Sequence, residues 1–86
     1  MKKIVEEVSG EGLESLLGET IIVWCMNYNY SGKLIGVNEQ DILLEDAHVV
    51  YETGDLNTTG FKDAQALPSQ HYVRIGGIES YGVWPK

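Results

Sequence analysis

The stretch that decides the fold is Tyr30–Asn38, which has the sequence YSGKLIGVN. Its aromatic and branched apolar residues favour a β-strand from Tyr30 to Val37, and the polar Asn38 ends that strand. Two glycines, Gly32 and Gly36, lie inside it. Because a glycine within a strand marks a bend or the close approach of another backbone, we predict a strongly bent strand.

The residues before this strand change from a helical period to a two-residue period at Gly18. Three leucines have helical spacing: Leu13, Leu16 and Leu17. With Ser9 as the cap and Gly18 as the stop, they predict an N-terminal α-helix of about residues 10–17. From Ile21 to Met26 both faces of a strand are apolar, so one face should meet the core and the other a helix or a partner.

The residues after Asn38 predict three more strands. Their expected bounds are 42–53, 71–75 and 78–84, with a long polar loop at 54–70 and Gly76-Gly77 between the last two. The sequence therefore predicts a mostly β protein, with an N-terminal α-helix followed by a five-stranded, strongly bent antiparallel sheet in a small SH3-type barrel. The alternative is an ordinary SH3-like or OB-type barrel that does not assemble.

The length and composition indicate a single acidic domain. The 86 residues are expected to form one domain. The net charge of −7 opposes nonspecific electrostatic binding of nucleic acid. Cys25 is the only cysteine, so the chain has no internal disulfide pair. The first residues lack a signal-peptide pattern and no apolar run is long enough to span a membrane, so we expect a cytoplasmic protein with no membrane partner.

Side chains suited to catalysis or metal binding are sparse. Ser31 has no histidine at a motif spacing, and Cys25 lies on an apolar strand face, where a thiol is usually inert. His48 and His71 are the only histidines. The Gly76-Gly77 pair joins two strands and does not lead into a helix as a phosphate-binding loop does. We expect no enzyme activity, no catalytic residue, no metal and no cofactor.

Four segments resemble the motifs of the Sm-like (LSm) family. LLGETIIV at 16–23 resembles that family's helix end and first strand, and YSGKLIGVN resembles the heart of the first Sm motif. LEDA at 44–47 resembles the end of the first motif, and VRIGGI at 73–78 resembles the second motif. The resemblance divides the chain into a first Sm motif at about 19–53, a variable loop at 54–70 and a second Sm motif at about 71–84.

The departures from the family pattern fall where the resemblance implies RNA binding. Members that bind uridine-rich RNA present a stacking aromatic or histidine, and an asparagine, between the second and third strands. Here that loop holds Glu39, Gln40 and Asp41, with Asp41 near the asparagine position, while Arg74 is retained and Ile75 replaces a glycine. The candidate RNA-binding residues are Gln40, Asp41, Arg74, Ile75 and Gly76.

Each candidate has a structural alternative. The Arg74 guanidinium suits phosphate or base edges, but it also suits an ion pair with a carboxylate. Asp41 can accept a hydrogen bond from a base N–H, or it can form a turn with its own backbone. Gln40 can cover a base with its planar amide. Phe61 is the loop aromatic to test as a partner contact, and Trp84 is expected to close the barrel as a lid.

The resemblance implies a homo-oligomeric ring of about five to seven copies that binds single-stranded, U-rich RNA. Unpaired edges of the last two strands offer a physical route to such a ring. Between Leu34 and Phe61, however, there are six acidic residues and no lysine or arginine, which opposes phosphate binding. The alternative is a protein-binding or scaffolding ring that does not bind nucleic acid.

Overall fold

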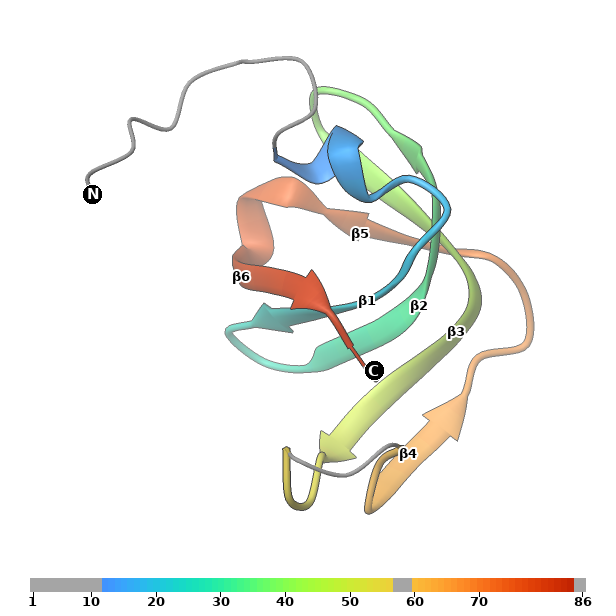
Figure 1. Cartoon of the computed structure of the whole chain (residues 1–86), viewed down its shortest axis with the longest axis vertical. Coiled ribbons are helices and arrows are strands. Elements are labelled where there is room, and N and C mark those ends of the chain that lie inside the picture. Colours follow the sequence, from blue (N-terminus) through green and yellow to red (C-terminus); the bar gives the residue numbers. More distant parts are fainter. Residues whose placement is uncertain (1–11, 57–59, 85–86) are drawn as a thin grey trace.

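The protein folds into a strongly bent antiparallel sheet (Figure 1). The structure is a computed structural model that describes residues 12–56 and 60–84. Its elements are the 3-10 helix η1 (Leu13–Leu16), the strands β1 (Thr20–Cys25), β2 (Asn29–Val37), β3 (Asp41–Glu52), β4 (Asp63–Ala66) and β5 (His71–Arg74), the 3-10 helix η2 (Ile75–Gly77) and the strand β6 (Ile78–Val83). The prediction of a mostly β, antiparallel fold is confirmed.

The long strand β3 organises the sheet. The strand order is β4-β3-β2-β1-β6, and β5 also pairs with β3. On the edge of β3 away from β2, residues 41–44 pair with β5 and residues 48–52 pair with β4. Figure 1 shows β3 curving across the molecule, with β5 beside its first half and β4 beside its second half. One strand therefore carries both pieces of the chain that follow it.

The bend in β2 and β3 is built around Gly32. The register between the two strands shifts between Ser31 and Lys33, and Asp46 in the matching part of β3 has a φ of 52°. A Cβ atom at Gly32 would lie 2.9 Å from the carbonyl oxygen of Glu45, which is too close for a side chain. The prediction that this glycine allows another backbone to approach is confirmed.

Apolar residues are buried on both faces of the sheet. The inner core contains Ile21, Val23, Leu34, Ile42, Leu44, Ala47 and Val73. Ile22 and Val50 are also buried. Trp84, only 7% exposed, packs against Phe61 with ring centroids 4.5 Å apart, and its indole N–H donates to the Leu56 carbonyl oxygen at 3.2 Å. Phe61 therefore folds back onto Trp84, while the role of Trp84 as a lid on the barrel stays a prediction.

The predicted α-helix at about 10–17 is wrong for the part that the structure describes, since residues 13–16 form a single 3-10 turn. Gly12 and Gly18, with φ of 77° and 91°, enclose too short a segment for the costly nucleus of an α-helix. The Ser15 hydroxyl also donates to the Gly12 carbonyl oxygen at 2.6 Å. Ser9, the predicted cap, lies outside the described residues.

No helix in residues 12–56 and 60–84 is long and apolar enough to cross a membrane.

The predicted loop at 54–70 contains a strand, β4, so the described sheet has six strands and not five. The DAQA sequence of β4 has no large apolar residue, and a two-residue period could not reveal it. The strand forms because the second half of β3 offers a free edge, where Val50 pairs with Ala64 and Val49 with Gln65. Leu67 continues this attachment through a 2.8 Å hydrogen bond from its N–H to the Ala47 carbonyl oxygen.

Candidate functional site

The turn between β2 and β3 is held by the side chain of Asn38. Its Oδ1 atom accepts hydrogen bonds from the backbone N–H groups of Gln40 and Asp41, each at 2.8 Å. The Asn38 N–H donates to the Asp41 carbonyl oxygen at 3.0 Å. The structure thus gives the turn-forming role to Asn38 and not to the Asp41 side chain. The turn presents Glu39 and Gln40 to solvent.

The second candidate segment is attached directly to this turn. The Ile75 N–H donates to the Gln40 carbonyl oxygen at 2.7 Å, where β5 passes into η2. Arg74 is the cross-strand partner of Asp41. Because paired residues project from the same side of a sheet, these two side chains share a face. They share it with Tyr72 and not with Val73, which lies in the core.

An open pocket of about 440 Å³ lies where the turn meets η2, lined by Glu39, Gln40, Arg74, Ile75 and Gly76. Four of the five predicted site residues line it, and the fifth, Asp41, is paired with Arg74. The structure therefore brings all five together, and their role in binding remains a prediction. The candidates omitted Glu39, although its position between Asn38 and Gln40 was a signal for it.

The pocket combines one positive and one negative side chain, and a second carboxylate lies beside it. Arg74 is exposed, and no carboxylate within residues 12–56 and 60–84 forms an ion pair with its guanidinium. The expected structural alternative for Arg74, an ion pair, is thus not formed within this part of the chain. Glu39 lines the same pocket and Asp41 lies beside it on β3. An added Cβ at Gly76 would meet no described heavy atom within 4 Å, so a ligand can reach the backbone there.

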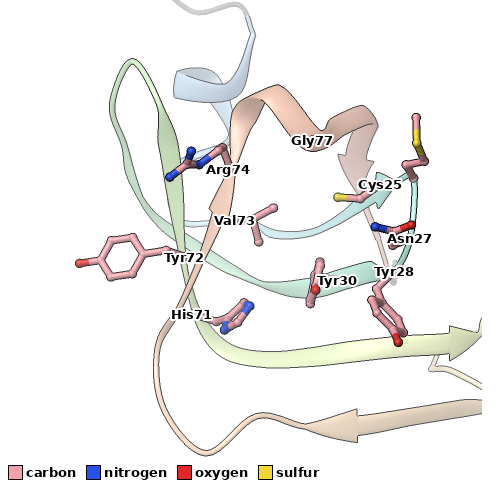
Figure 2. Close-up of a pocket in the computed structure, with 10 residues that line it drawn as sticks. Cys25, Asn27, Tyr28, Tyr30, His71, Tyr72, Val73, Arg74 and Gly77 are labelled. Carbon is pink, nitrogen blue, oxygen red and sulfur yellow. The ribbon is translucent and has the colours of Figure 1, made fainter.

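A second hollow of about 260 Å³ lies between β5 and the turn that joins β1 to β2. We call it the edge cleft, and it is lined by Cys25, Met26, Asn27, Tyr28, Tyr30, His71, Tyr72, Val73, Arg74 and Gly77. Figure 2 shows His71 and Val73 on the side of β5 that faces Tyr30, whereas Tyr72 points the other way. The rings of Tyr30 and His71 lie 5.2 Å apart at a tilt of 31°. The cleft wall is therefore mainly aromatic and apolar.

Two titratable groups of the edge cleft, Cys25 and Tyr30, have raised pKa values. Burial raises the pKa of the Cys25 thiol above its ordinary value. The pKa of Tyr30 is also raised, first by burial and then by the negative charges that Cys25, Tyr28 and Tyr51 carry when ionised. Cys25 is thus a weak nucleophile near neutral pH, in agreement with its expected inertness.

Two strands of the described sheet, β5 and β6, have unpaired outer edges. Among the described residues, β5 pairs only with β3, and β6 pairs only with β1. In β6, Val83 and Tyr81 pair with the buried Ile21 and Val23 and so lie on the inner face of the sheet. They are nevertheless 44% and 41% exposed, because no described strand pairs with the outer edge of β6.

A comparison with solved structures identifies the architecture. The chain is similar to the crystal structure of a heptameric archaeal Sm protein, with a TM-score of 0.66 over 85% of this chain and 96% of that one. This chain has an Sm-like fold. The sequence identity is 17%, so the likeness shows the fold alone.

The other comparisons give no match. No model of a protein family matches this chain. No curated protein matches it either. The Sm-like fold predicted from the short motifs is confirmed by the likeness of the backbone to the archaeal Sm protein.

The edge cleft escaped the sequence analysis, because Cys25, Tyr30 and His71 come from three separate strands. The aromatic rings of Tyr30 and His71 were the one available signal, and aromatic residues are common in strands for packing alone.

Proposed function

We propose that this protein forms a homo-oligomeric ring that contacts single-stranded RNA through the pocket around Arg74. The observation that carries the proposal is the direct attachment of η2 to the β2–β3 turn by the Ile75 to Gln40 hydrogen bond at 2.7 Å. This bond gathers a guanidinium, an amide and an open backbone in one pocket. Arginine and planar amides contact bases and backbones in single-stranded nucleic acids.

The ring is supported by the free edges of β5 and β6. If β6 of one copy pairs with β5 of the next, one of the two alternating registers sets Tyr81 and Val83 on the same face as His71 and Val73. The half-exposed side chains of β6 then fill the edge cleft of the neighbour. Such a head-to-tail contact closes into a ring when its rotation allows. The similar archaeal Sm protein is heptameric, and we propose about five to seven copies here.

The charge distribution decides how RNA is held. Each copy adds one Arg74 to the ring, but Glu39 and Asp41 lie beside every copy of it. Phosphate is repelled by these carboxylates, whereas a base edge offers donors as well as acceptors. We therefore propose that base edges, and not phosphates, are the main contacts in this pocket.

A protein-binding or scaffolding ring is the second candidate. The net charge of −7 favours it, because the charge opposes RNA at every surface outside the pocket. This candidate requires the same β5 and β6 edges but no base contact. The two candidates differ in one property, which is oligonucleotide binding at low salt.

The test is a fluorescence-anisotropy titration of U-rich and A-rich oligoribonucleotides at low salt. We expect Arg74→Ala to weaken binding by about 1–3 kcal/mol, the scale of a bidentate base contact, while the ring stays intact in light scattering. Lys33→Ala, which removes an exposed positive charge outside the pocket, is the matched control. If both variants bind like the wild type, or if no oligonucleotide binds, the scaffolding ring replaces the RNA-binding ring.

A further inference from the structure

We propose that the pocket around Arg74 selects guanine over uracil, adenine and cytosine. This inference rests on the proposed function, since it concerns which base enters the same pocket. It comes from the donors and acceptors that line the pocket and not from the likeness to the archaeal Sm protein. Glu39 is the specificity-determining residue in this proposal.

The walls of the pocket have separate hydrogen-bonding characters. The Arg74 guanidinium only donates, and the ionised Glu39 carboxylate only accepts. Ile75 adds an apolar surface, and Gly76 leaves room for a flat ring to approach the backbone. Arg74 and Glu39 line one pocket without forming an ion pair, so both keep hydrogen-bonding capacity for a ligand.

Guanine is the base that matches this pair of walls. Its O6 and N7 atoms are neighbouring acceptors, which an arginine reads with two parallel hydrogen bonds. Its N1–H and N2–H groups are neighbouring donors, which a carboxylate can accept together. A single-stranded base exposes both edges. One guanine can therefore satisfy Arg74 and Glu39 at the same time.

The other bases leave one wall unsatisfied. Uracil has a single N3–H between two carbonyl oxygens, and these oxygens face the carboxylate lone pairs when the N–H reaches Glu39. Adenine and cytosine each offer one exocyclic amino group beside an acceptor nitrogen. An acceptor placed against a carboxylate loses its hydrogen bond to water and gains none. The discrimination follows from this mismatch.

The experiment compares three heptaribonucleotides that differ only at the central position, which is guanosine, inosine or uridine in a run of uridines. One guanosine per strand prevents the strands from associating through guanines. We expect the guanosine strand to bind about tenfold more tightly than the uridine strand, the lower range of a bidentate base contact. Inosine lacks the N2 amino group, so its strand should bind with intermediate affinity.

Variants then assign the preference to Glu39. Glu39→Gln keeps the shape but replaces one acceptor by a donor, and we expect the guanosine-to-uridine ratio to fall toward one. Glu19→Gln removes the same charge at an exposed position outside the pocket and should leave the ratio unchanged.

The outcomes separate this inference from the proposed function. Uridine binding as tightly as guanosine, or a ratio that survives Glu39→Gln, overturns the guanine preference and leaves the RNA-binding ring standing. If none of the heptamers binds at low salt, the RNA-binding ring fails and the guanine preference fails with it.

Discussion

Gly32 and Gly76 are the same residue type in opposite surroundings. A Cβ atom at Gly32 would lie 2.9 Å from a backbone oxygen of β3, whereas one at Gly76 would meet no described heavy atom within 4 Å. Gly32 lies on the closed side of the barrel, where β1, β2 and β3 are fully paired. Gly76 lies on the open side, with the Arg74 pocket and the free edges of β5 and β6. The closed side therefore supplies stability, and the open side leaves surface free for partners.

The largest effect is expected from adding one methyl group to each glycine. Gly32→Ala forces the backbones of β2 and β3 apart and should lower the free energy of unfolding by about 3 kcal/mol. Gly76→Ala has open space and should change it by less than about 0.5 kcal/mol. Urea denaturation followed by tryptophan fluorescence measures both. Equal losses at the two positions would break the distinction between a closed and an open side.

The second effect is expected at the free edge of β6. Val83→Glu places a carboxylate against the apolar edge cleft of the next copy, which costs about 2 kcal/mol at each contact and should convert the ring to monomers. Leu17→Glu adds the same charge at an apolar position of similar exposure outside the strand edges and should leave the ring intact. Light scattering over a range of salt concentrations distinguishes the species. If the wild-type protein is a monomer of 9.6 kDa at every salt concentration, the proposed ring is wrong.

The third effect concerns the cysteine in the edge cleft. Since burial raises the pKa of Cys25, its thiolate is scarcer near neutral pH than that of an ordinary thiol. Alkylation by iodoacetamide should therefore be slow and should accelerate toward alkaline pH. The same shift makes the stability of the fold fall as pH rises from the unfolded pKa through the raised folded value, because the unfolded chain releases the thiol proton first.

A neighbouring copy in the edge cleft would protect Cys25 from alkylation more than its raised pKa does alone. If a neighbouring copy covers Cys25, the Val83→Glu monomer should be alkylated about tenfold faster than the ring at the same pH. Equal rates in the two proteins would show that β6 of the neighbour does not lie over this cleft.

The smallest effect is expected on the open side, at Asp41. Asp41→Asn removes a negative charge beside Arg74 and should strengthen binding to U-rich strands by about 0.5 kcal/mol. Glu19→Gln removes an equal charge outside the pocket and should strengthen it less. The anisotropy titration at low salt measures both. Identical gains would mean that net charge alone, and not the position beside Arg74, controls the affinity.

The closed side was accessible to sequence reasoning, and much of the open side was not. The alternation from Ile21 and the glycine in YSGKLIGVN predicted β1, β2 and the bend within β2. The strand β4 was missed because its stability comes from the free edge of β3 and not from its own apolar residues. The α-helix was predicted from leucine spacing, but the positive φ angles of Gly12 and Gly18 confine that segment to one 3-10 turn.

The sequence by itself determined the mostly β class, the bend at Gly32 and the residues available to a site. These are local properties, because strand period and the absence of a Cβ act within a few residues. The tertiary structure alone decided that Glu39 joins the Arg74 pocket and that the rings of Tyr30 and His71 lie against each other. Such contacts join residues from different strands, and their geometry depends on strand register, which is set by the packing of the whole sheet.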